Sequence, residues 1–340
     1  MFIVQSYTLA VILCFVIMLC WGSWGNTQKL AAKSWRYELF YWDYVIGMVL
    51  FALLLAFTLG SIGEAGRPFL ADLKQASLSS IMWIVVGGII FNLSNILLSA
   101  STSIAGLSVA FPLGVGLALV LGVVNNYRVA MQQGAKTGEV SLLILGVALV
   151  VCAIVCNGIA SGRKGESSIS KADQKKGIIL ALLAGIIMSF FSSFVMRAMD
   201  TTNFAAPEAG KVTPYTAIVI FSLGVLLSNF LFNTIVMRKP FVGEPVSYSQ
   251  YFKGDAKTHL VGMLGGAIWC LGTALSYITA EKAGPAVSYA LGQGAPLVAA
   301  IWGVFVWKEF KGAKKGTAGL LVAMFFLYVA GLSAIVVAGM

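Results

Sequence analysis

Residues 87–122 of the chain, GGIIFNLSNILLSASTSIAGLSVAFPLGVGLALVLG, align without a gap with residues 265–300, GGAIWCLGTALSYITAEKAGPAVSYALGQGAPLVAA. Thirteen of the 36 aligned positions are identical, and they include Gly106 and Gly284 in a short link. The sequence therefore predicts that each copy forms two apolar helices joined by a tight turn. The copies are 178 residues apart, and five hydrophobic segments fit into that interval. Because five is odd, the second copy must enter a membrane in the opposite direction. Inverted repeats of this kind are typical of secondary transporters.

The composition places the chain in lipid. Of its 340 residues, 59% are hydrophobic and 11% are charged, whereas a soluble domain has roughly 25% charged residues. A helix needs roughly 20 apolar residues to cross a hydrocarbon core of about 30 Å. Ten stretches meet that requirement, near residues 7–25, 39–60, 80–100, 104–124, 140–160, 177–199, 213–236, 258–280, 286–306 and 317–338. The sequence therefore predicts an all-α integral membrane protein with ten transmembrane helices, arranged as two inverted five-helix repeats.

One polar stretch divides the chain near its middle. Residues 161–176, SGRKGESSISKADQKK, are too short and too charged to form a domain, and they read as a cytoplasmic linker. We expect a first five-helix repeat over 1–160, the linker over 161–176 and a second repeat over 177–340. The links between the helices leave no room for a soluble catalytic domain.

The basic residues predict the orientation. Sixteen of the 23 lysines and arginines lie in the first, fifth, seventh and ninth links between helices. Links rich in lysine and arginine stay in the cytoplasm, so we expect the odd-numbered links inside and both termini outside. The net charge of +10 is explained by this bias, and it does not predict a nucleic-acid partner.

The chain lacks the residue patterns of common catalytic and metal sites. Its single histidine, His259, lies at a predicted helix end, and its five cysteines all lie inside apolar segments. The sequence contains no GxSxG, HExxH or GxxxxGK[ST] pattern. We therefore expect no enzyme activity, no metal site and no cofactor. Transport would be driven by an ion gradient or would proceed as facilitated diffusion.

Three polar residues share one face of the third predicted helix. Asn92, Asn95 and Ser99 follow the i, i+3, i+7 spacing. Polar groups buried without partners are costly in lipid, so these residues either bond to neighbouring helices or line a central cavity. We favour the cavity, because the repeat places Thr273 and Tyr277 at the positions equivalent to Asn95 and Ser99.

Aromatic and amide side chains accompany these polar groups. Trp269 aligns with Phe91 in the repeat, and Tyr289 and Gln293 lie one turn apart in the ninth helix. Flat rings combined with amide groups suit a planar or ring-shaped, uncharged polar solute, and no basic residue lies in the middle of a helix. The candidate substrate-binding residues are Trp21, Asn92, Asn95, Ser99, Trp269, Thr273, Tyr277, Tyr289 and Gln293.

Trp24 and Asp43 lie near predicted helix ends. Tryptophan is common at the membrane–water interface, and we interpret Trp24 as an anchor there. Asp43 is the carboxylate best placed to enter a helix from an apolar setting. Charged residues at the bilayer centre cost roughly 2.5–3.5 kcal/mol and tend to be functional. Proton coupling is one hypothesis for Asp43, and positioning or gating at the helix end is the other.

Several motifs resemble those of the ureide permeases, a plant family within the drug/metabolite transporter superfamily. The motifs are LCWGSW (19–24), YWDY (41–44), AFTLGSIGE (56–64), GGIIFNLSN (87–95), GLSV (106–109), PLV (296–298), WGV (302–304) and EF (309–310). The likeness spans most of the chain. It departs at the linker 161–176, which lacks the long central loop of the plant proteins. The same glycine-rich repeat also resembles the bacterial glucose/ribose porters and the rhamnose–proton symporter.

The resemblance implies a permease that carries allantoin or oxo-purines and pyrimidines together with protons. We expect secondary-active transport of such a metabolite, across the inner membrane of a bacterium. The expected partners are the small-molecule substrate, protons and the lipid bilayer, and the oligomeric state stays open. A monosaccharide–proton symporter is the first alternative, and a drug/metabolite exporter is the second. A membrane scaffold without transport activity is the rival from a different class.

Overall fold

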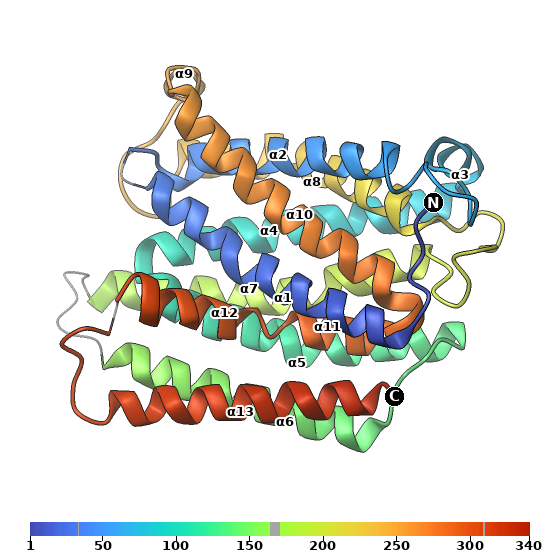
Figure 1. Cartoon of the computed structure of the whole chain (residues 1–340). Coiled ribbons are helices and arrows are strands. Elements are labelled where there is room, and N and C mark those ends of the chain that lie inside the picture. The colour runs from blue at the N-terminus through green and yellow to red at the C-terminus, as the bar shows by residue number, and fades with distance from the viewer. Residues whose placement is uncertain (33, 164–170, 309) are drawn as a thin grey trace.

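The computed structural model describes residues 1–32, 34–163, 171–308 and 310–340. Ten helical spans within these residues are long and apolar enough to cross a membrane (Figure 1). Glu309 and residues 164–170 of the predicted linker lie outside the described residues. The helices are α1 (Tyr7–Ala31), α2 (Tyr37–Phe57), α3 (Phe69–Gln75), α4 (Leu78–Ala105), α5 (Leu107–Gln133), α6 (Val140–Gly162), α7 (Lys171–Ala198), α8 (Pro214–Arg238), α9 (Tyr248–Phe252), α10 (Ala256–Ala283), α11 (Pro285–Gly292), α12 (Ala295–Ile301), the π-helix η1 (Trp302–Val306) and α13 (Thr317–Ala338).

Each predicted segment falls on one of the ten spans, but most spans extend beyond the prediction. The first segment is predicted to end near residue 25, whereas α1 continues to Ala31. Polar side chains in this extension find partners inside the protein: the Thr27 hydroxyl donates to the Trp24 carbonyl at 2.6 Å, and the Gln28 amide donates to the Ser99 carbonyl at 3.3 Å. Because these groups are satisfied internally, the helix can continue past the apolar stretch.

The ninth span is not one continuous helix. Helix α11 ends at Gly292, α12 begins at Ala295, and η1 follows α12. Pro296 has no backbone N–H, so it cannot donate the α-helical hydrogen bond to the Gly292 carbonyl. Helix α5, the equivalent span in the predicted repeat, continues through Pro112. The interruption is therefore a feature of the second half of the chain.

Glycines allow the closest helix contacts in the bundle. A β-carbon at Gly266 of α10 would lie 1.8 Å from the Tyr44 carbonyl oxygen of α2, and one at Gly47 of α2 would lie 2.0 Å from the Met263 carbonyl oxygen of α10. Real β-carbons do not approach that closely, so only glycine permits this crossing. Small residues at helix crossings are typical of membrane proteins, where close packing drives association.

The packing partners in the two halves correspond. Helix α4 packs on α7 and α10 packs on α1, while α4 also packs on α8 and α10 on α2. The glycines at the two tight turns also adopt similar backbone angles, with φ 84° and ψ 155° at Gly106 and φ 80° and ψ 145° at Gly284. These correspondences support the predicted pair of five-helix repeats, which stays a prediction together with its boundaries.

Both chain termini lie at one end of the bundle, together with α3 (Figure 1). Helix α9 lies at the opposite end (Figure 1). We refer to these as the terminal end and the far end. Helices α6 and α13 lie side by side at one edge of the bundle, away from α2 and α8 (Figure 1).

Candidate substrate cavity

A cavity lies in the middle of the bundle, and its empty volume, including the part open to solvent, is about 420 Å³. We call it the central cavity. Small-molecule sites in proteins combine an apolar lining with a few polar groups. The lining residues come from α1, α4, α5, α7, α10 and the break between α11 and α12, and they are Trp21, Trp24, Phe91, Asn95, Leu98, Phe111, Val115, Met188, Phe191, Trp269, Gln293 and Ala295.

Aromatic rings form much of the lining. The ring centroids of Phe91 and Trp269 lie 4.1 Å apart, with an angle of 31° between the ring planes. Behind them, Phe221 stacks on Trp269 with a centroid distance of 5.9 Å and an interplanar angle of 17°. Phe191 meets the edge of Phe91 at 5.2 Å. The rings fix one another, so the cavity presents a preformed aromatic surface.

Asn95 and Gln293 supply the two amides of the lining, which also holds the indole N–H groups of Trp21, Trp24 and Trp269. The Asn95 Nδ2 atom donates to the Tyr41 hydroxyl at 3.2 Å, which orients the amide from behind. Gln293 occupies the break between α11 and α12 and is 5% exposed. Within the described part of the chain, no residue hydrogen-bonds the Gln293 side-chain amide. Its donor and acceptor are therefore available to a solute.

Trp21 is held in place by a second residue of the predicted site. Its Nε1 atom donates to Thr273 Oγ1 at 3.2 Å, and the Thr273 hydroxyl in turn donates to the Trp269 carbonyl at 3.1 Å. The ring of Trp21 meets the edge of Tyr289 at 6.4 Å. Helices α1 and α10 therefore position one wall of the cavity together.

The structure brings four of the nine predicted residues to the cavity lining, namely Trp21, Asn95, Trp269 and Gln293. The other five lie in the helix interfaces around it. Asn92 donates to Ser228 Oγ at 2.9 Å, and the Tyr289 hydroxyl donates to the Ala118 carbonyl at 3.1 Å. Ser99, Thr273 and Tyr277 are buried in interfaces of α4 and α10.

The interpretation of Trp24 as an interface anchor is wrong. Trp24 is 3% exposed and lines the cavity, where its ring lies 5.0 Å from Tyr44 and 6.0 Å from Phe111. The error follows from the short prediction for the first helix, because α1 continues for seven residues beyond Trp24. The apolar lining residues, such as Phe111 and Met188, have no sequence pattern that distinguishes them from residues that face lipid.

Asp43 lies in a separate cluster and is fully buried. Its Oδ1 atom accepts from the Tyr251 hydroxyl at 2.6 Å and lies 2.7 Å from His259 Nδ1, and its Oδ2 atom accepts from Trp35 Nε1 at 3.1 Å. We call these four residues the Asp43 cluster. Burial and the hydrogen bond to Asp43 raise the pKa of Tyr251 above its usual range. The cluster joins α2, the link before it, α9 and α10 near the far end.

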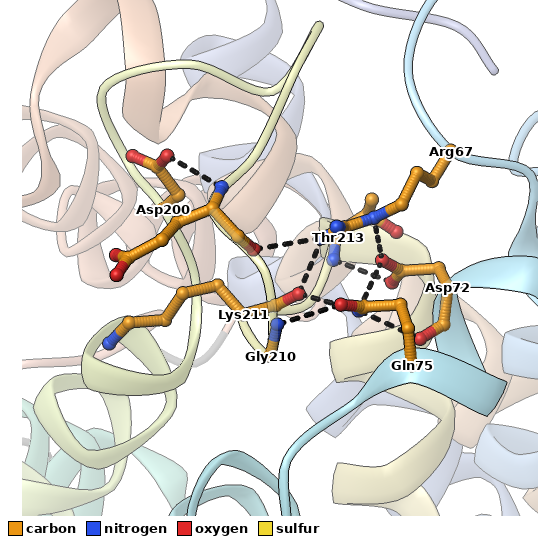
Figure 2. Close-up of polar contacts among 8 residues, drawn as sticks. Arg67, Asp72, Gln75, Asp200, Gly210, Lys211 and Thr213 are labelled. Carbon is orange, nitrogen blue, oxygen red and sulfur yellow. Dashed lines mark hydrogen bonds and ion pairs between the residues drawn. The ribbon is translucent and has the colours of Figure 1, made fainter.

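A second polar cluster ties two links together at the terminal end (Figure 2). Arg67 Nε donates to Asp72 Oδ1 at 2.9 Å, and the Thr213 backbone N–H donates to Asp72 Oδ2 at 2.7 Å. The Gln75 amide donates to the Lys211 carbonyl at 2.8 Å. Because Asp72 is fully buried, these partners hold the link after α2 against the link before α8.

Comparison with known proteins identifies the family. The ureide permease family profile matches residues 40–176 and 163–339. Ureide permease 1 of Arabidopsis thaliana is 23% identical over 97% of this chain and 96% of its own length. The L-rhamnose-proton symporter of Citrobacter koseri is 26% identical over 70% of each chain. A solved crystal structure has the same fold, with a TM-score of 0.58, 15% identity and 96% of each chain covered. The chain is therefore a multi-pass integral membrane permease, not an enzyme, and it belongs to the ureide permease family.

Proposed function

We propose that the chain is a secondary-active permease that carries a ureide, purine or pyrimidine base by alternating access, driven by protons. The central cavity is the observation that carries this proposal. Phe91 and Trp269 offer aromatic faces on which a flat ring can stack, and Asn95 and Gln293 offer amides that pair with carbonyl and N–H groups. Among the described residues of the lining, none carries a charge. An ion would lose its hydration there without compensation.

A monosaccharide is the alternative substrate. The L-rhamnose-proton symporter is a relative of this chain, and a sugar can also stack its apolar face on Trp269. A sugar, however, presents a hydroxyl on nearly every ring atom, whereas the polar groups of the described lining are the two amides of Asn95 and Gln293 and the indole N–H groups of its tryptophans. A cationic drug would favour acidic groups in the lining, and the described lining holds none. The cavity therefore favours a flat heterocycle over both.

The Asp43 cluster supports proton coupling. A buried carboxylate within a membrane span is costly and is typical of proton pathways. Asp43 and His259 lie within 2.7 Å of each other and are contributed by different spans. A proton bound by this pair changes the charge that holds α2 to α10. Proton uptake is thereby linked to movement of these two helices. In this proposal the Asp43 cluster both couples transport to protons and gates the helix end.

Alternating access is supported by the corresponding helix packings and by the interrupted ninth span. Broken helices at the binding site are a feature of secondary transporters. The basic residues of the odd-numbered links favour a cytoplasmic far end and external termini. Both termini lie at the same end of the bundle (Figure 1). We propose this orientation in the plasma membrane of a bacterium.

Uptake by proteoliposomes tests the proposal. Labelled allantoin, uracil, hypoxanthine, glucose, ribose and rhamnose are each offered with and without an inward proton gradient. We expect the gradient to stimulate uptake of a heterocycle, and we expect Asn95→Leu to abolish that uptake. Met82 lies on the exposed side of the same helix, so Met82→Leu is the control and should keep the uptake. If the gradient stimulates uptake of a sugar and of no heterocycle, the substrate is a sugar and the proposed substrate class is wrong. Equal uptake with and without the gradient would remove the proton from the mechanism.

A further inference from the structure

Unpaired polar atoms concentrate on one seam of the bundle, between α2, α4 and α8. Thirteen buried side-chain polar atoms have no hydrogen-bond partner among the described residues, and seven of them lie on α2, α4 and the second half of α8. Each is costly unless something bonds to it. The seven atoms are the hydroxyls of Tyr37 and Tyr44, Asn92 Oδ1, Ser99 Oγ, Asn233 Oδ1 and both side-chain polar atoms of Asn229. We call these six residues the polar seam.

Hydrogen bonds between the helices show how the seam runs. Asn92 of α4 donates to Ser228, the neighbour of Asn229 on α8. One turn further along α8, Asn233 Nδ2 donates to the Glu38 carbonyl of α2 at 2.8 Å. Asn229 and Asn233 are four residues apart, so they share a face of α8. The seam therefore follows α8 from the middle of the span toward its last residues.

The seam begins at the central cavity and ends near water. Asn95 lines the cavity and donates to Tyr41 of α2, and Tyr41 stacks on Tyr44 with a centroid distance of 5.4 Å. At the other end, Tyr37 begins α2 next to Arg36, whose side chain is 35% exposed. Helix α2 begins and α8 finishes at the far end of the bundle (Figure 1). The unpaired groups thus lie on three helices that run between the cavity lining and that end.

Ordinary helix packing does not account for Asn229. Polar residues in membrane bundles usually bond across to a neighbouring helix, as Asn92 and Asn233 do with one atom each. Asn229 is fully buried and makes no such bond to a described residue with either its oxygen or its nitrogen. The Asn229 amide has an unpaired donor and an unpaired acceptor. It can therefore hydrogen-bond to a mobile molecule, such as water or a neutral solute.

We propose that the polar seam is the route by which water and the neutral solute pass between the central cavity and the far end. Its amides and hydroxyls bond in turn to water and to the carbonyl and N–H groups of the passing molecule. Amides and hydroxyls carry no net charge, so they exchange partners without holding an ion. The solute part of this proposal rests on the proposed transport function, whereas the water part does not.

Cysteine accessibility tests the route. The background carries Cys152→Ser and Cys156→Ser, which removes the exposed and half-buried cysteines and leaves the three buried ones. Asn229→Cys, Asn233→Cys and Tyr37→Cys are placed in it one at a time. Leu227→Cys, at an α8 position that is 67% exposed on the lipid side, is the matched control. The probe is a small methanethiosulfonate reagent, which reacts with the thiolate and therefore requires water at the cysteine.

We expect Asn229→Cys to react within about tenfold of an exposed link cysteine at Asp255→Cys, and Leu227→Cys to react about a hundredfold more slowly. A transported solute at saturation is expected to slow the reaction at Asn229→Cys severalfold. If Asn229→Cys and Asn233→Cys both react as slowly as Leu227→Cys in protein that still transports, the route is wrong. If they react but no transported solute protects them, the solute does not pass this way. The reaction without solute does not depend on the substrate, so failure of the uptake panel leaves the water route standing.

Discussion

The rings of Phe91 and Trp269 pack against each other with their centroids 4.1 Å apart, although 178 residues separate them in the chain. The sequence repeat aligns these same two residues with each other. Two equivalent positions can meet only where the two halves of the bundle face one another. The contact therefore lies where the two predicted repeats meet, and both residues line the cavity there. A solute bound on this pair would contact both halves at once, which alternating access requires.

The first prediction concerns the aromatic surface. Trp269→Leu should raise the KM for the transported solute about tenfold, because ring stacking contributes about 0.5–1.5 kcal/mol beyond buried area. Trp269→Phe keeps a ring and should recover most of the affinity. Leu264→Ala, on the exposed side of the same helix, is the control. Equal KM values for the leucine and phenylalanine variants would show that the solute does not stack on this residue.

The second prediction separates the two amides of the cavity. Gln293→Leu should raise KM about ten- to hundredfold, because a solute group left without its partner costs about 1–3 kcal/mol. Asn95→Leu should have a similar effect and should also release the Tyr41 hydroxyl, which now accepts from Asn95. The KM values come from initial uptake rates, and melting temperatures in detergent verify that each variant is folded. A change in maximal rate at constant KM would assign the amides to the conformational step instead.

The third prediction concerns the break in the ninth span. In Pro296→Ala the backbone N–H returns, so the break between α11 and α12 can close into a continuous helix. Pro296 costs little in the first turn of α12, but in a continuous helix it would cost about 3 kcal/mol relative to alanine. The substitution therefore makes the continuous span accessible, and we expect an equal or higher melting temperature and a lower maximal transport rate. Thermal melting and uptake measure the two effects. A more stable variant with unchanged transport would show that the break has no part in the cycle.

The fourth prediction separates coupling from binding at the Asp43 cluster. Asp43→Asn and His259→Gln should abolish gradient-driven accumulation, yet keep exchange of labelled for unlabelled solute at equal pH. Asp255→Asn changes an exposed carboxylate at the start of α10 that can still cap the helix, and it should behave like the unaltered protein. Loss of both accumulation and exchange, in folded protein, would assign the cluster a structural role.

The fifth prediction concerns the ties at the terminal end. Arg67→Ala leaves the buried Asp72 carboxylate without its charged partner (Figure 2), which should lower the free energy of unfolding by about 1–3 kcal/mol. Melting of the purified protein measures the loss, and the exposed Lys74→Ala provides the control. An unchanged melting temperature would mean that the Thr213 N–H and Gln75 alone hold Asp72.

The sequence was sufficient to predict the ten spans, because long apolar stretches have few alternatives in a chain with so little charge. It also singled out Asn95 and Gln293, since an amide within an apolar helix is conspicuous. Phe111 and Met188 could not be found in this way, because an apolar side chain can face a cavity, a helix or lipid with the same pattern.

The partners of Asp43 show a second limit of sequence patterns. Trp35, Tyr251 and His259 reach the carboxylate from three different segments, and no periodicity connects them. His259 gave no signal on its own, because a lone histidine at a helix end is unremarkable until its neighbour is known. The buried position of Asp43 therefore depends on how α2, α9 and α10 pack.

The central claim is that the cavity alternately faces the two sides of the membrane with a neutral heterocycle bound. Counterflow at equal pH tests it without any assumption about coupling: proteoliposomes loaded with unlabelled allantoin, uracil or hypoxanthine are diluted into the labelled compound. We predict transient accumulation of label with at least one heterocycle, and its loss in Gln293→Leu. The absence of accumulation with every heterocycle, in vesicles that contain folded protein, would contradict the account.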